Sequence, residues 1–381
     1  MKNLFFEITE FRNFSKLKTE KKQIVFYSEN PSQWDFYENI IKLLIKKNTI
    51  CYITSSKEEF KKNKIKNKNF FKFYLGSGII RTIFFSTLKS KILVMSLPDL
   101  NKFHIKRSKY PVFYIFIPHN LLSTHMIFRK NAFDHYDSFF SSGEHQNKEI
   151  RESENIYKTK KKELVNFGCC RLDKIIKLNS EYKRKRNEEI TVLISPSWGK
   201  NGLLESNSIE LIKSIIKNKI KIILRPHPDT IRLNPESINK LTKTFKNNKY
   251  FILKPDISSI DDYFEVDLMI SDWSGSAFEF AFGTLKPVIF VNMPKKINNP
   301  DYIKFKNKPI EIEMRKKIGS VVERKDINKI PFLIKDLIKN EKTWKKKILN
   351  LRDKEFFNIN KSGKVGAEFI LKKINEENHN Y

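Results

Sequence analysis

The feature that most constrains this fold is a regular alternation of short apolar segments with longer amphipathic ones. Apolar segments of strand length lie at residues 23–28, 49–54, 70–75, 91–96, 110–118, 138–142 and 164–167. Segments of helical length and pattern lie between them, at residues 33–46, 79–88 and 144–157. Wholly apolar strands that alternate with helices are typical of parallel sheets covered by helices on both faces. We therefore predict an α/β fold, and we leave the first twenty residues unassigned because they show no clear period.

The alternation stops near the middle of the chain and then begins again. Residues 181–189 are charged and lack glycine, and strands are expected beyond them at residues 190–195, 221–225, 250–253, 268–271 and 287–292. A chain of 381 residues is long enough for two domains. We predict an N-terminal domain at residues 1–185, a C-terminal domain at 186–345, and a helical segment at 346–381 that packs back on the first domain. Two Rossmann-type, doubly wound domains would then face a central cleft, where the carboxyl ends of the strands bind ligands.

Composition excludes several classes of protein. No apolar segment approaches the roughly 18–20 residues that a membrane-spanning helix needs. Three cysteines, two of them adjacent, exclude a disulfide-rich secreted domain and favour the cytoplasm. The net charge of +31 attracts anionic membrane surfaces and phosphate-rich partners, although lysine-rich composition accounts for most of it. Since no nucleic-acid-binding motif is present, we expect no specific nucleic-acid partner.

The strongest candidate for a binding site is the segment Ser271-Asp272-Trp273-Ser274-Gly275-Ser276, which links an apolar strand to a helix. Ser274 suits the N-cap, and Gly275 lets a ligand approach the backbone closely. Free amides at a helix N-terminus, with hydroxyls beside them, bind a phosphate or a pyrophosphate. Glu279, about one turn later, is placed to accept hydrogen bonds from ribose hydroxyls. An ordinary capped turn has the same pattern, so the prediction also depends on its neighbours.

Two neighbouring strand ends carry suitable groups. In Arg225-Pro226-His227-Pro228, the arginine offers a bidentate fork to a phosphate and His227 offers a donor or a base. After the first strand of the second half, Ser197, Gly199 and Lys200 form a turn that can surround an anion with amides and a cation. The turn lacks the spacing of a P-loop, and a surface turn with a structural histidine is the alternative for His227.

The first half contributes two histidines, His119 and His125, just after an apolar strand. Their separation of six residues does not place them on one helical face, so we expect no shared metal. Either histidine is a candidate general base that acts across the cleft, and either is equally a structural turn residue. We expect no metal and no cofactor.

Taken together, these segments resemble a known family, the CDP-glycerol glycerophosphotransferases, which build teichoic-acid-like and capsule-like polyol-phosphate polymers. The most specific part of the likeness runs from Arg225-Pro226-His227-Pro228 to Lys286-Pro287-Val288-Ile289-Phe290 and includes the Ser274 turn. The remaining segments that carry it are Ser195-Pro196-Ser197-Trp198-Gly199, Pro118-His119-Asn120 and Gly168-Cys169-Cys170-Arg171-Leu172-Asp173. The resemblance implies a GT-B fold, with a CDP-alcohol held mainly by the C-terminal domain and the acceptor approaching from the N-terminal one.

The resemblance also implies roles for residues. By position, His119 matches the family's proposed base, His227 matches its second essential histidine near the phosphates, and the turn from Ser274 to Ser276 matches the pyrophosphate-binding turn. The sequence departs from the family at Pro118 and Asn120, which replace a tryptophan and a glycine around the first histidine. Trp273 stands where tyrosine is commoner, and Gly168-Cys169-Cys170-Arg171 replaces the usual Gly-Tyr-Pro-Arg.

The resemblance predicts a transferase that moves a glycerol-phosphate, or a related polyol-phosphate, from a CDP-alcohol to a hydroxyl of a cell-surface glycan or lipid-linked polymer. Such an acceptor predicts a peripheral position at the inner face of the cell membrane, held by basic patches. A GT-B glycosyltransferase or a UDP-sugar epimerase shares the same frame and remains an alternative. A basic nucleic-acid-binding protein is a more remote one.

Overall fold

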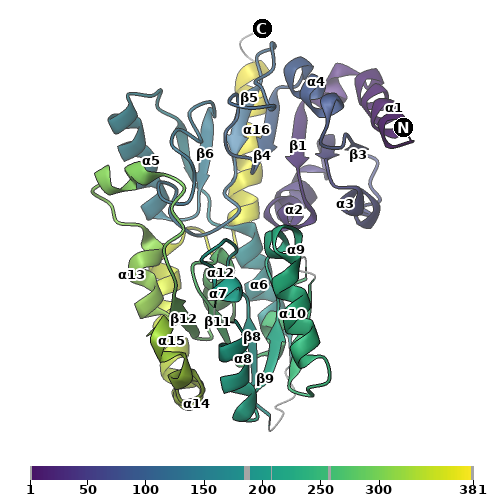
Figure 1. The fold of residues 1–381 in the computed structure, drawn as a ribbon. Helices are drawn as coiled ribbons and strands as arrows, with labels where there is room; N and C mark the ends of the chain where they lie inside the picture. The colour runs from purple at the N-terminus through teal and green to yellow at the C-terminus, as the bar shows by residue number, and fades with distance from the viewer. Residues whose placement is uncertain (1, 184–188, 207, 256–258, 379–381) are drawn as a thin grey trace.

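The structure, a computed structural model, describes residues 2–183, 189–206, 208–255 and 259–378, and it contains two parallel sheets (Figure 1). The first sheet has seven strands in the order β3-β2-β1-β4-β5-β6-β7. These strands are β1 (Ile24–Ser28), β2 (Ile50–Thr54), β3 (Phe70–Tyr74), β4 (Ile92–Met95), β5 (Phe113–Phe116), β6 (Ser138–Ser141) and β7 (Glu163–Asn166). The order reverses between β1 and β4, where Ile24 pairs with Ile50 on one side and Ile92 on the other. Reversals of this kind create the crevice in which α/β proteins bind ligands.

The second sheet has six strands in the order β10-β9-β8-β11-β12-β13. They are β8 (Thr191–Ile194), β9 (Lys221–Leu224), β10 (Phe251–Leu253), β11 (Leu268–Ser271), β12 (Val288–Asn292) and β13 (Gly319–Glu323). Its order reverses between β8 and β11, so both sheets are doubly wound, and the predicted α/β class is confirmed. The predicted boundary between residues 185 and 186 lies outside the described residues, and the exact domain limits stay a prediction.

Helices cover both faces of each sheet. Those around the first are α1 (Lys2–Lys16), α2 (Trp34–Leu44), α3 (Lys57–Lys62), α4 (Ile79–Thr87), α5 (Glu144–Tyr157) and α6 (Cys170–Glu181). Those that follow β8 are α7 (Leu203–Ser206), α8 (Ser208–Lys217), α9 (Pro228–Leu233), α10 (Pro235–Phe245), α11 (Asp262–Glu265), α12 (Gly275–Thr284), α13 (Ile310–Lys317), α14 (Ile330–Lys339), α15 (Glu341–Glu355) and α16 (Ser362–Asn378). Short 3-10 turns lie at Thr19–Lys22, Pro31–Gln33, Pro300–Lys304 and Arg324–Lys329. Among the helices in the described part of the chain, none is long and apolar enough to cross a membrane.

The two halves share one core where α6 packs between α2 and α12. Gly283 permits this approach, because a Cβ there would lie 2.3 Å from Cγ2 of Ile175 on α6. The chain then returns through α16, drawn in yellow beside the first sheet in Figure 1, and α16 packs against α2. Within the described residues, the closing segment that was expected to be helical at 346–381 comprises the end of α15 and the whole of α16. Asn358 and Asn360 adopt left-handed backbone conformations in the turn that separates them.

Several elements were not predicted, and packing explains them. Helix α1 occupies part of the unassigned first twenty residues, and its Phe14 ring packs edge-on against Phe73 and Phe84 at 5.5 and 5.3 Å. Helix α6 follows β7, the last strand of the first sheet in chain order. Strand β13 completes the second sheet beside β12, with Gly319 opposite Val288. Local pattern alone is weak in these segments, and contacts distant in sequence stabilise them.

Candidate functional site

A cavity of about 640 Å³ lies between the two halves, at the carboxyl ends of their strands. The first half lines it with the loops after β1, β4 and β5, and the second half with the segments after β8, β9, β11 and β12. Of the residues singled out from sequence, those that line the cavity are His119, Ser197, Arg225, His227, Ser274, Gly275, Ser276 and Glu279. The structure therefore brings strand ends as far apart in sequence as those of β1, at Ser28, and β12, at Asn292, to one site.

The N-terminus of α12 forms one wall of this cavity. Ser274 is the N-cap residue, and its side chain accepts no hydrogen bond from the first amides of the helix, all of which lie in the described part of the chain. Its Oγ lies 2.8 Å from Oγ of Ser276, which in turn lies 3.3 Å from Oγ of Ser195. Free amides, the positive end of the helix dipole and adjacent hydroxyls together make an anion site. A Cβ on Gly275 would lie only 3.4 Å from Cβ of Asn120, so the loop of the first half closes directly over this turn.

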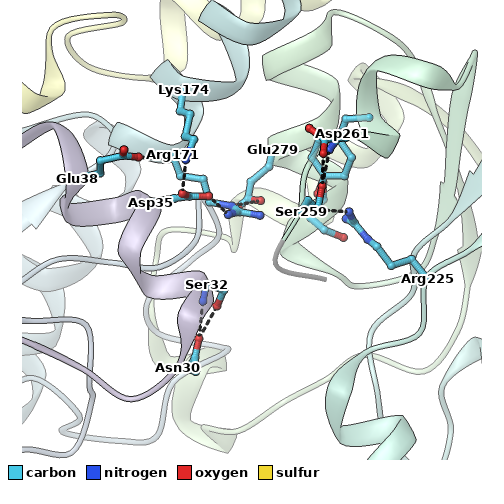
Figure 2. A network of polar contacts seen from close by, with 12 residues as sticks. Asn30, Ser32, Asp35, Glu38, Arg171, Lys174, Arg225, Ser259, Asp261 and Glu279 are labelled. Carbon is cyan, nitrogen blue, oxygen red and sulfur yellow. Dashed lines mark hydrogen bonds and ion pairs between the residues drawn. The ribbon is translucent and has the colours of Figure 1, made fainter. Parts of the chain in front are cut away.

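Arg225 lies at the end of β9 and is almost wholly buried. Its Nη1 donates a hydrogen bond of 3.0 Å to the carbonyl of Ser259 (Figure 2). Its guanidinium lies 4.7 Å from the centre of the Tyr263 ring. Its Nε is buried and has no hydrogen-bond partner among the described residues. The side chain is thus held in place at one end while donors that suit an anionic ligand remain unused.

His227 is the N-cap residue of α9, where its Nδ1 accepts a hydrogen bond of 3.1 Å from the amide of Asp229. This bond assigns the proton of the neutral ring to Nε2. Burial lowers the pKa of His227 to about 4, with Lys296 adding to the effect and Asp229 opposing it. The ring is therefore neutral at pH 7 and offers one N–H donor. It does not carry the extra proton that a general acid needs.

Sequence reasoning missed Lys296, which follows β12 and lines the cavity. Its Nζ lies 3.9 Å from the centre of the Trp198 ring, and that ring lies 6.0 Å from the ring of His227. Burial lowers the pKa of Lys296, and nearby carboxylates, Asp229 first among them, oppose the shift. The signal was present, because Lys296 follows a strand at the sheet edge where ligands bind.

Three residues expected to contact a ligand have other surroundings. Lys200 is exposed and does not line the cavity, so Lys296 supplies the cation that was expected from the β8 turn. Asp272 is 1% exposed and also does not line the cavity. Its Oδ1 accepts hydrogen bonds of 2.7 Å from the amides of Ser197 and Trp273, and its Oδ2 accepts one from the amide of Leu203 at 3.3 Å. Asp272 therefore joins the β8 and β11 turns and has no oxygen directed at a ligand. Gly199 belongs to the same β8 turn and lies outside the lining as well.

Glu279 lines the cavity but one of its oxygens is already engaged. Oε2 accepts a hydrogen bond of 2.9 Å from Nε of Arg171, and the same guanidinium contacts Asp35 of α2 (Figure 2). Lys174 adds a contact of 2.6 Å to the other oxygen of Asp35. These coulombic contacts raise the pKa of Arg171 against the effect of burial. The network connects α2, α6 and α12 and fixes the orientation of Glu279, and it leaves Oε1 as the oxygen for a ligand.

The two histidines of the first half have different surroundings. His119 lines the cavity, and its Nδ1 is buried without a hydrogen-bond partner among the described residues. Burial lowers the pKa of His119, and a contact with the backbone of Ser96 opposes the shift. The structure does not bring His125 into the cavity. Its Nδ1 lies 3.3 Å from Glu149, and its ring stacks on Phe305 with centres 4.6 Å apart. His119 is therefore the one of these two histidines that lines the cavity.

Within the described residues, no cluster of three His, Cys, Asp or Glu side chains is arranged to hold a metal ion. The cavity presents amides, hydroxyls, Arg225 and Lys296 on one wall and an imidazole on the other. Such a set suits a ligand with adjacent negative charges and a hydroxyl that must lose a proton.

Comparisons with known proteins agree with this chemistry. A family model described as CDP-Glycerol:Poly(glycerophosphate) glycerophosphotransferase matches residues 11–297. A search of curated proteins found no match. Among solved structures, the wall teichoic acid polymerase TagF, after a 30 minute soak with CDPG, is similar with a TM-score of 0.60 at 14% identity, over 97% of this chain and 94% of that one.

Two sugar-nucleotide proteins are about as similar. The putative UDP-N-acetylglucosamine 2-epimerase from Listeria monocytogenes has a TM-score of 0.60 at 12% identity, over 94% of this chain and 97% of that one. The MnaA–UDP co-structure from S. aureus has a TM-score of 0.60 at 13% identity with the same coverage. Identities this low show the fold alone, and they confirm the predicted GT-B arrangement.

Proposed function

The chain belongs to the CDP-glycerol:poly(glycerophosphate) glycerophosphotransferase family, and on this premise we propose how the cavity performs the transfer. The donor is CDP-glycerol, and the acceptor is a hydroxyl at the end of a polyol-phosphate or glycan polymer. The observation that carries the proposal is the N-terminus of α12, where the Ser274 side chain makes no capping bond and hydroxyls lie beside the first amides, facing the loop of His119 across one cavity. This arrangement puts an anion site and a proton acceptor on opposite walls.

The second half of the chain holds the donor in this proposal. The diphosphate lies at the N-terminus of α12, where amides, Ser274 and Ser276 donate hydrogen bonds to its oxygens. Arg225 and Lys296 balance its negative charge, and Ser197 adds a hydroxyl from the β8 turn. Oε1 of Glu279 accepts from a ribose hydroxyl, while the contact of Oε2 with Arg171 keeps the carboxylate in position.

The transfer step needs little covalent help from the protein. The acceptor oxygen attacks the phosphorus that carries glycerol, a new P–O bond forms, and the P–O bond to CMP breaks. The acceptor proton passes to the imidazole of His119, which burial keeps neutral and ready to accept it. The charge that develops on the transferring phosphoryl group is stabilised by Arg225 and the α12 amides, which are already in place before reaction.

His227 has a narrower role here than sequence suggested. Its Nδ1 is engaged with Asp229, so the ring offers Nε2–H to a phosphate oxygen. With a pKa of about 4, His227 supplies a hydrogen bond to the leaving CMP and not a proton. CMP leaves as a phosphate monoester. Its departing oxygen is only weakly basic, so it needs no general acid to protonate it.

A sugar-nucleotide epimerase is the second candidate, because epimerases share the fold at the same TM-score as the teichoic acid polymerase. The family match favours CDP-glycerol over UDP-sugars. The experiment is to measure CMP release from CDP-glycerol with a poly(glycerophosphate) acceptor, beside UDP-N-acetylglucosamine turnover. Acceptor-dependent CMP release that His119→Asn abolishes supports the proposal. Turnover of the UDP-sugar without CMP release would overturn it.

We also propose that the enzyme works at an anionic membrane surface on the cytoplasmic face, where a lipid-linked acceptor would be found. The support is the net charge of +31, since each Lys or Arg near such a surface contributes about 1 kcal/mol of binding. Flotation with vesicles containing anionic lipid tests this, with neutral phosphatidylcholine vesicles as the control. Binding only to the anionic vesicles, reversed by salt, is expected. No binding at low salt would refute it.

A further inference from the structure

The loop that follows β5 and carries His119 is held from the other half of the chain. Glu311, in the first turn of α13, is 2% exposed and lines the cavity. Its Oε2 accepts a hydrogen bond of 3.0 Å from the amide of Ser123, and its Oε1 accepts one of 2.7 Å from the Ser123 hydroxyl. Both oxygens of one buried carboxylate thus bind one residue, which fixes the position and the orientation of that part of the loop.

The same loop is also held from its own side and from the segment after β12. Glu149 of α5 accepts hydrogen bonds from the amide and the hydroxyl of Thr124. Nδ2 of Asn299 donates to the carbonyl of His125 at 3.0 Å, and the amide of Asn298 donates to the carbonyl of Met126 at 3.0 Å. Every residue from 123 to 126 therefore has a partner outside the loop, and Nε2 of Gln146 on α5 donates to the carbonyl of Leu122 at 3.0 Å. Of the hydrogen bonds that come from the second half, those of Glu311 lie nearest to His119 in the sequence.

The position of this loop decides where His119 lies relative to the donor. Between β5 and β6 the chain has no regular secondary structure to fix it. Asn120 and Leu122 lie against Gly275, the first residue of α12, so a shift of the loop changes the gap above the proposed diphosphate site. In group transfer, misplacement of a reacting group by about 1 Å can cost about 100-fold in rate.

We propose that Glu311 is a positioning residue for the transfer: from the donor-binding half, it holds Ser123 and so sets His119 against the bound donor. The proposal rests on the proposed function, since it concerns the base of that reaction. It assigns to α13 a role in catalysis although no atom of α13 need touch the donor. On this proposal, the proton transfer also depends on the contact between Glu311 of the second half and Ser123 of the first.

Substitutions at both ends of the contact test the proposal. Glu311→Gln removes the charge and one acceptor, Ser123→Ala removes the hydroxyl donor, and Glu313→Gln on the exposed side of the same helix is the matched control. We expect kcat for CMP release to fall up to about 100-fold in Glu311→Gln. We expect the Kd for CDP-glycerol, measured by calorimetry, to stay within about twofold. Glu311→Gln combined with Ser123→Ala should be little slower than Glu311→Gln alone, because both remove the same contact.

A second measurement does not depend on activity. Hydrogen–deuterium exchange of a peptide that spans residues 119–127 should be faster in Glu311→Gln than in Glu313→Gln, while peptides from the second sheet keep their protection. Unchanged exchange of that peptide, or unchanged kcat, would overturn the proposal. A donor Kd that weakens in proportion to kcat would also overturn it, because Glu311 would then act on the donor. If the unsubstituted protein releases no CMP, the proposed function fails, and the exchange result still decides whether Glu311 holds the loop.

Discussion

His227 caps a helix in this structure and has a second task in the proposed function, and two substitutions distinguish the two. Its Nδ1 caps α9 through the amide of Asp229, and its Nε2–H is free to donate to a phosphate. His227→Ala removes both. His227→Asn keeps the cap, because the side-chain oxygen of asparagine is among the best N-cap acceptors. The asparagine side chain is too short to replace the Nε2–H donor at the ligand.

The magnitudes follow from these contacts. Loss of an N-cap costs about 1 kcal/mol of folding free energy, so His227→Ala should lower the free energy of unfolding by about that amount and His227→Asn should not. A hydrogen bond to a charged phosphate contributes about 1.5–3 kcal/mol, which corresponds to about 10- to 150-fold in kcat/KM. Both variants should lose activity to this extent, because both lose the Nε2 donor.

The assay measures CMP release and denaturant unfolding on the same preparations of His227→Ala, His227→Asn and the unsubstituted protein. The expected pattern is a shared kinetic loss with a stability loss in the alanine variant alone. A normal rate in His227→Asn would show that the residue is only a cap. Two results together would refute the neutral state assigned to His227: a loss far above 1,000-fold in both variants, and an activity of the unsubstituted protein that rises toward pH 5. They would show that His227 works in its protonated form.

The remaining predictions concern stability with pH, the missed lysine, the carboxylate that joins two turns and the contact between the halves. Burial lowers the pKa of His227 to about 4, so between pH 4 and the usual pKa near 6.5 the unfolded chain binds more protons than the folded one. The free energy of unfolding should therefore fall as pH falls through that range, and it should depend less on pH in His227→Asn. Lys296→Met should raise the KM for CDP-glycerol about tenfold or more, whereas Lys200→Met, outside the cavity, should leave it unchanged, and the reverse order would refute the assignment. Asp272→Asn should lower the free energy of unfolding by about 2–3 kcal/mol, since an amide group would face backbone donors, and an unchanged denaturation midpoint would contradict this. Gly283→Ala should destabilise the protein by about 1–3 kcal/mol by pushing α12 away from α6, which thermal unfolding would detect, and a rise in melting temperature would argue against the close packing described.

Local pattern was sufficient for the fold class and for the main strands. Apart from β13, the strands of both sheets are short apolar segments, and many of the segments between them have helical patterns, so the residues themselves carry the information. Motifs at strand ends were also readable, because a parallel sheet places all its carboxyl ends at one edge. For this reason Arg225, His227 and Ser274 were selected from sequence, and the structure brings them to one cavity. Their roles in the reaction stay predictions.

Only the tertiary structure decided which polar residues reach the cavity. Asp272 stands in the motif beside Ser274 but faces the backbone of the β8 turn, while Lys296, in no motif, lies over Trp198 inside the lining. His119 and His125 are six residues apart and equivalent by sequence, yet apolar packing against Phe305 takes His125 out of the cavity. Glu311 contacts Ser123 across 188 positions of chain. Side-chain direction in a loop depends on what the rest of the chain packs against it, and no local period in the sequence records that.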